Sequence, residues 1–439
     1  MLNAIIDDFV ALYESNAKQR SDEWYQLIKS TVGGSDMGVI AGVNPYKCIR
    51  DFIKERVGDT PFSGNLACWW GTVFEDIIAR IIELDCNTSV KGAEITITND
   101  HLPGIRFSPD GYCVVRMHND GEQLVLRNMS GGIAYGEESG SGRVICDDTC
   151  EHCRDFIALV EIKCPLRRKP NENIPPYYVS QIHSGLCFSP IAHFGMFTEA
   201  VIRKRGLHNV FRDPLVAWGI IGIYGATSDS DDDSDAKEVD LGCVSYETLE
   251  WYLKRMCGSD AEFSYEWSDP SFERGDQFAE RDRLRRSAPV GRRLVAILPW
   301  IAEQLHYKFV ERNTSFLQEL VPDIRMFHKM VNEARSEGSS HKFHPDYVDP
   351  DEIESPKRRA KRELSKSEQD FYGGIELDFV PPTIESGPAA SAAPKRPPRA
   401  TARAPPQTRV PKKEYFVQQR ARAEESFYTD IDLPRHLRS

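Results

Sequence analysis

The chain has 439 residues, of which 40% are hydrophobic and 10% aromatic, which is enough to bury a large core in one big domain or two. No apolar run approaches a bilayer span and the N-terminus carries no signal-peptide pattern, so we expect a soluble intracellular protein with no membrane role. The net charge of −12 does not exclude DNA binding. Many of the acidic residues lie in a predicted disordered loop over residues 227–236, and a DNA-binding protein needs basic side chains only where its surface contacts the DNA backbone.

Apolar spacing predicts several helices before residue 90. The first covers residues 1–20, and a helix around Trp24 leads through a Gly-Gly-Ser turn into another short helix. Backbone N–H groups and the hydroxyl of Ser35 at that helix start suit an anion, although Ser35 acting only as an N-cap is an equal alternative. A longer amphipathic helix over residues 69–82 places Glu75 near its first turn.

Two predicted strands bring charged residues together. Residues 108–111 are a Ser-Pro-Asp-Gly turn, which leaves Asp110 at the bend before a strand. Residues 155–165 form an apolar strand that ends at a proline. Glu161 and Lys163 are two apart in this strand and therefore point to the same face. Burying such charges is costly unless they are paired, bound to metal or open to a cleft.

A hairpin of these strands would place Asp110, Glu161 and Lys163 in one pocket, with Glu75 as a candidate third acid. Carboxylate ligands of this kind suit Mg²⁺ or Mn²⁺. A long Gly-, Ser- and charge-rich stretch over about residues 116–156 separates the strands. We interpret it as an insertion, because an unstructured loop of this length would count against a hairpin.

Cysteines crowd into the end of this insertion. Cys146, Cys150, Cys153 and the neighbouring His152 are residue types that bind Zn²⁺. The spacing matches no standard zinc knuckle and no second pair is evident, so free cysteines in a loop are the alternative.

Further elements are predicted downstream of the Lys163 strand. The basic run Arg167, Arg168 and Lys169 is either a DNA contact or a solvated surface. Apolar patterns then predict a helix over 177–188, strands over 215–225 and 239–244, a helix over 246–256, and a helical extension over 257–340 with helices around 294–310 and 316–334.

The chain changes character beyond about residue 340. Residues 341–439 are rich in proline, alanine and basic side chains and cannot bury a core, which predicts a disordered tail. The cluster Pro356–Arg362 indicates a nuclear localisation signal, with a generic basic tail as the alternative.

Several short motifs in a fixed order carry a family resemblance. They are Trp-Gly-x-x-Phe-Glu at residues 70–75, Ser-Pro-Asp-Gly at 108–111, Glu-Ile-Lys-Cys-Pro at 161–165 and Tyr-Val-Ser-Gln-Ile-His at 178–183. Over roughly residues 20–255 the chain resembles the lambda-exonuclease-like, YqaJ-type viral recombinases and alkaline nucleases of the PD-(D/E)xK superfamily.

The resemblance implies a restriction-endonuclease-like α/β (α+β) fold, with a central mixed sheet flanked by helices within residues 1–256. It implies that Asp110, Glu161 and the Ile162 carbonyl bind Mg²⁺, for which Mn²⁺ can substitute. Glu75 would help to bind this ion or a second one, and Lys163 would activate the attacking water.

The resemblance also implies DNA or phosphate contacts from polar and basic residues around this centre, namely Lys29, Ser35, Ser108, Arg167, Arg168 and Gln181. One position departs from the family pattern. Ile28 stands where relatives carry an arginine, so either Lys29 takes over or recognition of a terminal 5′-phosphate is weaker. For Gln181, ordinary helix packing is the alternative.

The implied function is a Mg²⁺-dependent alkaline deoxyribonuclease, mainly a 5′-to-3′ exonuclease on linear duplex DNA in viral recombination, replication or genome processing in the host nucleus. The implied partners are double-stranded DNA ends and a single-strand annealing or ssDNA-binding protein, and the oligomeric state is left open. The alternatives are a structure-selective endonuclease on the same fold and an inactive DNA-binding or packaging protein.

Overall fold

The structure is a computed structural model that describes most of the chain up to residue 336. The described residues are 1–19, 21–58, 64–99, 104–119, 124–128, 144–145, 150–168, 170, 173–212, 215–226, 238–257 and 262–336. The acidic loop, the basic cluster Pro356–Arg362 and the tail predicted over 341–439 lie outside these residues, as does Cys146.

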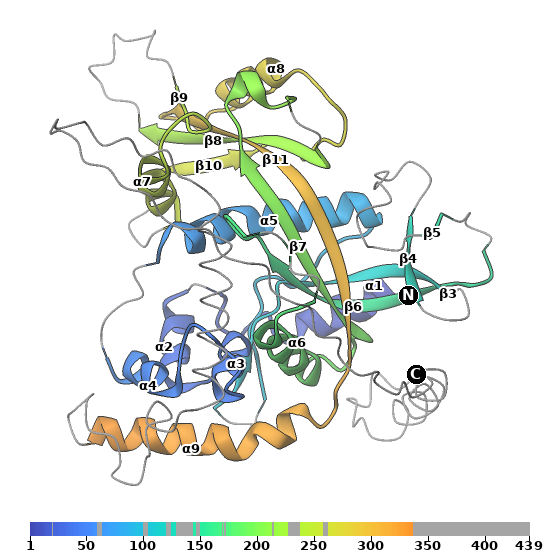
Figure 1. Ribbon diagram of the computed structural model, residues 1–439, viewed down its shortest axis with the longest axis vertical. Helices are drawn as coiled ribbons and strands as arrows, with labels where there is room; N and C mark the ends of the chain where they lie inside the picture. The colour runs from blue at the N-terminus through green and yellow to red at the C-terminus, as the bar shows by residue number, and fades with distance from the viewer. Residues whose placement is uncertain are drawn as a thin grey trace, which may run out of the picture. The chain divides into compact units, whose positions relative to one another are not determined.

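A mixed sheet of nine strands organises the described part of the chain (Figure 1). Across the sheet the strands are β10 (Ser264–Trp267), β8 (Ala217–Ala226), β11 (Arg292–Glu311), β7 (Phe194–Lys204), β6 (Cys153–Lys163), β3 (Gly111–Asn119), β4 (Leu124–Asn128) and β5 (Val144–Ile145), with β9 (Val239–Asp240) beside β11. The pairs β6–β7, β4–β5 and β9–β11 are parallel and the others antiparallel. A separate small sheet joins β1 (Ile97–Thr98) to β2 (Arg106–Phe107).

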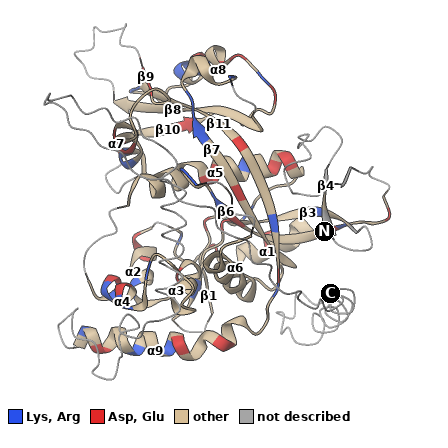
Figure 2. Ribbon diagram, in the orientation of Figure 1, with Lys and Arg blue, Asp and Glu red and all other residues tan. Residues whose placement is uncertain are grey.

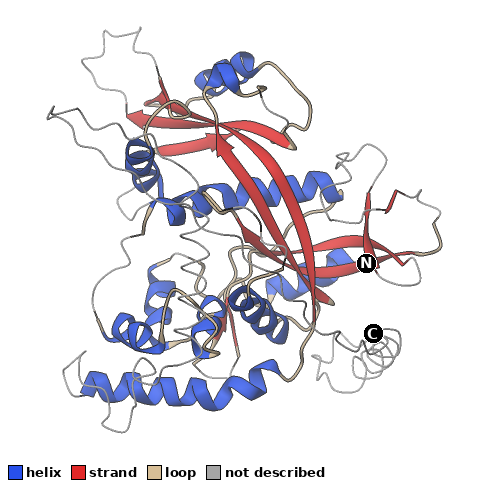
Figure 3. Cartoon of the chain, in the orientation of Figure 1, coloured by secondary structure: helices blue, strands red, loops and turns tan. Residues whose placement is uncertain are grey.

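Helices cover both faces of the sheet (Figure 3). On one face, α5 (Leu66–Cys86) and α7 (Tyr246–Cys257) share a hydrophobic core with Ala158, Val160 and Ile162 of β6. Ile157 and Leu159 alternate with them and face the opposite core. That second core contains side chains of α1 (Leu2–Ala11), α3 (Met37–Ile40), α4 (Ile49–Val57), α6 (Pro176–Phe188) and α9 (Phe316–Ser336). The predicted mixed sheet flanked by helices is therefore confirmed.

Two more helices complete the described fold. α2 (Asp22–Ser30) begins after Ser21, whose side chain accepts a hydrogen bond from the Trp24 backbone N–H. α8 (Gln277–Arg286) packs through Leu284 on a third core with β8 and β11. Within the described residues, no helix has both the length and the apolarity needed to cross a membrane.

Helix α5 begins earlier than the sequence pattern indicated. Asn65 caps it by accepting a hydrogen bond from the Cys68 N–H, and Asn87 ends it in the left-handed conformation with φ of 48°. Since the helix starts at Leu66, the prediction that Glu75 lies near its first turn is wrong, and Glu75 lies near the middle. The helical pattern of apolar residues begins only at residue 73, so it did not reveal the N-cap Asn65, eight residues upstream.

The predicted hairpin is confirmed. β3 pairs with β6 from Gly111 opposite Val160 to His118 opposite Cys153. Gly111 has a φ of 147°, and an added Cβ there would collide with Val90, so glycine is required directly after Asp110. The stretch predicted as an insertion contributes β4 and β5, and it also contains the outer halves of β3 and β6.

The predicted helix over residues 294–310 is wrong, because this segment is most of the 20-residue strand β11. The helical extension predicted over 257–340 is therefore mixed, and only α8 and α9 are helical among its described elements. β11 is buried between two neighbours, so its apolar run is nearly continuous and shows no period of two. On one side of β11, the pairing with β9 ends at Ile297 and the pairing with β7 begins at Trp300. Pro299 lies between the two, where the strand does not need a backbone N–H for pairing on that side.

Gly185 and Gly71, each within a helix, provide a matched test of how closely α6 packs against the sheet. A Cβ at Gly185 in α6 would lie within 3.0 Å of Phe107 and Leu159, whereas a Cβ at Gly71 in α5 would meet nothing within 4 Å. We expect Gly185→Ala to lower the free energy of unfolding by about 1–3 kcal/mol through overpacking. Gly71→Ala should raise it by about 0.5–1 kcal/mol through better helix propensity. Urea denaturation measures both, and equal effects of the same sign would contradict this packing.

Candidate active site

The predicted acidic centre lies where β3 begins and β6 ends. Asp110 directly precedes β3, and its Oδ2 accepts a hydrogen bond of 2.7 Å from the Ile162 backbone N–H. Glu161 and Lys163 flank Ile162 and share the face of Leu159, on the α6 side of the sheet. The hairpin register therefore brings the turn carboxylate beside the strand carboxylate.

Glu161 is the most deeply buried acid of this group, with 1% of its side chain exposed. Its Oε1 forms an ion pair with the Lys163 ammonium. Burial raises the pKa of Glu161 to about 8, with Lys163 opposing the rise and Asp110 and Glu75 adding to it. Burial alone would lower the pKa of Lys163, but Glu161 and Asp110 outweigh it and leave that pKa raised.

Glu75 approaches this centre from α5. Its negative charge raises the pKa of Glu161, as the charge of Asp110 does, but by less. The structure therefore brings together Glu75, Asp110, Glu161 and Lys163, which come from α5, the turn before β3 and the end of β6.

A further buried ion pair adjoins the centre and was missed by sequence reasoning. Glu199 of β7 is fully buried, lies opposite Lys163 in the parallel register, and forms an ion pair with Arg168. The available signal was a single glutamate inside the apolar segment 194–202, the same signal that drew attention to Glu161. Arg168, predicted as a DNA contact, thus directs its guanidinium to a buried carboxylate.

Four carboxylates gather in this cluster. Asp110 and Glu75 act electrostatically on Glu161, and Glu199 pairs with Arg168. Carboxylate oxygens at the end of a buried strand are ligands that suit a hard divalent cation such as Mg²⁺. The residues present therefore fit a divalent metal ion.

Helix α6 forms one wall of the centre. The Lys163 ammonium lies 5.1 Å from the ring centroid of Tyr178, and Gln181 follows Tyr178 by three residues on the same helix face. Figure 2 shows that α6 carries no charged residue, whereas acidic and basic residues colour the strands beside it. The charged groups of the centre therefore come from the strands, the turn before β3 and α5, whereas α6 carries polar and aromatic groups.

The predicted anion site around Ser35 lies against the same helix. Ser35 is exposed in a short 3₁₀ turn, Gly34–Asp36, before α3. A Cβ at Gly34 would lie 2.6 Å from Phe107 Cδ2, and one at Gly33 would lie 2.8 Å from Arg106 Nη1, so these glycines allow the turn to approach both side chains closely. Gln181 Cγ would lie 3.8 Å from the Gly34 Cβ, which is an ordinary contact distance.

Arg106 is a basic residue beside this turn that the sequence interpretation did not weigh. Arg106 is 5% exposed, and its guanidinium lies 5.1 Å from the Trp24 ring centroid. Burial lowers its pKa to about 10, with Asp36 opposing this and Arg56 adding to it. Trp24 also donates from Nε1 to the Ser108 hydroxyl at 3.4 Å, which fixes the predicted phosphate ligand Ser108 in the same region.

Lys29 and Arg167 lie in other surroundings. Lys29 lines a cavity of about 820 Å³ between α2 and α9, and none of Glu75, Asp110, Glu161 or Lys163 lines it. Arg167 is exposed, with its guanidinium 4.8 Å from the Tyr246 ring centroid. We do not assign the active site to this cavity, because its lining residues offer no set of carboxylates comparable to the acidic centre.

Comparisons with known proteins agree with this order of motifs. Residues 23–190 match the YqaJ-like viral recombinase domain. A protein of African swine fever virus, from the Pretoriuskop tick isolate, is 32% identical over 284 residues, which cover 60% of this chain and 75% of the viral protein. The chain belongs to the YqaJ-like viral recombinase family. The recognition made from the motifs is confirmed.

Two further similarities are more distant. The uncharacterized protein YqaJ of Bacillus subtilis is 30% identical over 78 residues, which is 17% of this chain and 24% of that protein. Among solved structures, the alkaline exonuclease LHK-Exo from Laribacter hongkongensis aligns with a TM-score of 0.32 and 14% identity over 72% of this chain and 95% of LHK-Exo. The YqaJ-like family match spans Glu75, Asp110, Glu161 and Lys163 and ends before Glu199.

The buried ion pair of Glu161 with Lys163 should contribute to the stability of this YqaJ-like protein. Lys163→Met leaves the Glu161 carboxylate buried without its cation, so it should lower the free energy of unfolding by about 3–5 kcal/mol in chelator. Glu161→Gln removes the buried charge and should cost less than about 1 kcal/mol. Denaturant unfolding at slightly alkaline pH measures both changes.

A surface pair supplies the control. Lys91 contacts Asp7 at 2.6 Å in an exposed ion pair, so Lys91→Met should change stability by less than about 1 kcal/mol. A Lys163→Met variant as stable as Lys91→Met would contradict the buried pairing.

Proposed function

We propose that this chain is a divalent-metal-dependent deoxyribonuclease that hydrolyses phosphodiester bonds. The observation that carries the proposal is the buried Glu161, placed beside Asp110 by the β3–β6 register and paired with Lys163. A chance surface hairpin would not bury a carboxylate among like charges. Membership of the YqaJ-like viral recombinase family supports the same conclusion.

The proposed metal ligands are Asp110, Glu161 and the Ile162 carbonyl, with Glu75 binding the same ion or a second one. Mg²⁺ bound there, or Mn²⁺ in its place, would polarise the phosphate and lower the pKa of a bound water. The Ile162 N–H fixes Asp110 at this point by donating to its Oδ2. Lys163 positions the attacking water and offsets charge on the phosphate in the transition state.

The DNA backbone is proposed to run along the α6 side of the centre. The turn that carries Ser35 packs near Gln181, Arg106 lies beside Gly33, and the Ser108 hydroxyl accepts a hydrogen bond from Trp24. Arg167 offers an exposed cation beyond the strand end, and Lys29 would act from the cavity beside α9. Arg168 is proposed to act on DNA only indirectly, by compensating Glu199.

The finer proposal is an alkaline exonuclease that degrades linear duplex DNA mainly from 5′ to 3′. A viral recombinase that resects duplex ends would expose a strand for an annealing or ssDNA-binding partner, and the basic cluster Pro356–Arg362 would direct it to the host nucleus. A structure-selective endonuclease is the second candidate, supported by the same acidic centre.

The test is digestion of linear duplexes labelled at the 5′ or the 3′ end, at alkaline pH with Mg²⁺, beside covalently closed circles. We expect early release of the 5′ label as mononucleotide, intact circles and no activity in chelator. Glu161→Gln and Lys163→Met should each reduce the rate by at least about 10²-fold while DNA binding persists. Cut circles would favour the endonuclease, and intact linear DNA would favour a binding or packaging protein.

Neighbouring acids on α5 provide a matched control. Glu75 is half-buried and acts electrostatically on Glu161, whereas Asp76 is exposed. Glu75→Gln should lower the rate by about 10–100-fold, and Asp76→Asn by no more than about twofold. Equal effects would remove Glu75 from the site.

A further inference from the structure

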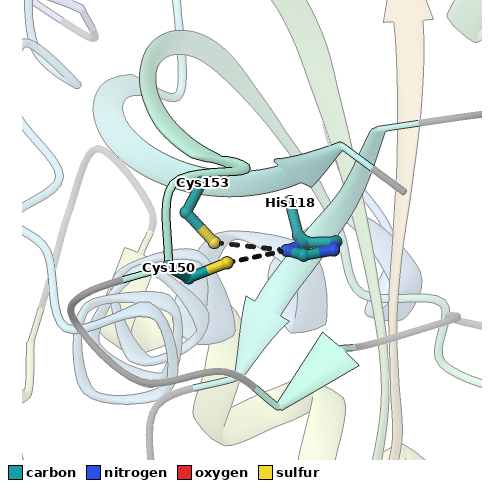
Figure 4. Close-up of side chains that lie close together, drawn as sticks. All are labelled: His118, Cys150 and Cys153. Carbon is teal, nitrogen blue, oxygen red and sulfur yellow. Dashed lines mark hydrogen bonds between the residues drawn. The ribbon is translucent and has the colours of Figure 1, made fainter. Parts of the chain in front are cut away.

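A second cluster of metal-binding side chains lies at the other end of the β3–β6 hairpin. His118 of β3, Cys150 before β6 and Cys153 at its start point toward one another (Figure 4). His118 Nδ1 is 3.4 Å from Cys150 Sγ and 3.5 Å from Cys153 Sγ. Among the described residues, these form the group of at least three His, Cys, Asp or Glu residues whose ligand atoms all lie within 4.8 Å of one another.

The separations fit a tetrahedral zinc ion. With Zn–S near 2.3 Å and Zn–N near 2.05 Å, a tetrahedral angle places a nitrogen and a sulfur ligand about 3.6 Å apart. Both nitrogen–sulfur distances lie within about 0.2 Å of that value. A sulfur–imidazole hydrogen bond explains one such contact, but two thiols converging on one ring nitrogen are better explained by a shared ion.

The backbone holds the ligands in this arrangement. Cys150 and Cys153 form a C-x-x-C turn in which the Cys153 N–H donates to the Cys150 carbonyl at 3.1 Å. Cys153 is 8% exposed and lies directly opposite His118 in the antiparallel register. Two ligands from a tight turn and one from the neighbouring strand thus converge without any rearrangement of the backbone.

His152 lies close by, with its ring centroid 5.9 Å from that of His118, but it is exposed and is not part of the group of three whose ligand atoms lie within 4.8 Å of one another. Soft thiolates with imidazole select Zn²⁺ over the hard cations that suit the carboxylate centre. On binding, the two thiols lose their protons, and His118 coordinates through an unprotonated Nδ1 and keeps its proton on Nε2.

We propose that His118, Cys150 and Cys153 bind a structural zinc ion that fastens the outer end of the β3–β6 hairpin. The pair Gly111–Val160, next to Asp110, is seven residue steps from the pair His118–Cys153, or about 24 Å along the strands. The ion therefore takes no part in hydrolysis. It clamps the two strands where the long connecting segment leaves them, and it maintains the register that sets Asp110 beside Glu161.

The test is the metal content of the full-length protein purified without added metal. Mass spectrometry should find about one zinc per chain, falling to about zero in His118→Ala and in the double variant Cys150→Ser/Cys153→Ser. Two variants should retain the zinc: Cys243→Ser, which changes an exposed cysteine elsewhere, and Glu161→Gln, which changes the carboxylate centre.

A measurement on the unmutated chain avoids variants that fail to fold. Cobalt exchanged for zinc should give the near-ultraviolet charge-transfer bands of thiolate coordination, and alkylation of Cys150 should abolish them. Zinc-free protein, cobalt without thiolate bands, a disulfide joining Cys150 to Cys153, or full zinc content in the double variant would each overturn the proposal. None of these readouts depends on nuclease activity.

Discussion

The burial of one carboxylate constrains the rest of this structure. Glu161 lies at the end of a strand with both neighbours in place, and its charge is tolerated because Lys163 pairs with it. Asp110 comes to the same point because Gly111 allows a sharp bend and the Ile162 N–H fixes one carboxylate oxygen. Carboxylate oxygens gathered at this point are the ligands that a hard divalent cation prefers.

The elements around this carboxylate follow from its position. β6 and β7 are parallel, so a crossover must return the chain, and α6 is that crossover. α6 therefore lies on the face of Glu161 and Lys163, bringing Tyr178 and Gln181 with it. The Gly33-Gly34 turn packs on α6 in turn, which brings the exposed Ser35 and the buried Arg106 to the same region. A polar surface beside an acidic centre is thus a consequence of the strand order.

Sequence patterns predicted the elements whose signals are local. The Pro-Asp-Gly turn and the charged pair in an apolar strand were sufficient for the hairpin, since both depend on neighbouring residues. β11 was mistaken for a helix because a strand buried on both sides lacks alternation. Glu199 and Arg168 pair across 31 positions, and His118 meets Cys150 across 32, so only the sheet register reveals them. Arg106 was overlooked because burial of a cation beside Trp24 leaves no periodic signal.

Anomalous diffraction from crystals grown with Mn²⁺ tests the central claim most directly. We expect a manganese peak within coordination distance of Asp110 and Glu161, and any second peak should lie near Glu75. Crystals of Glu161→Gln should show no manganese peak. Manganese bound elsewhere in the wild-type protein, with Glu161 still paired only to Lys163, would contradict it.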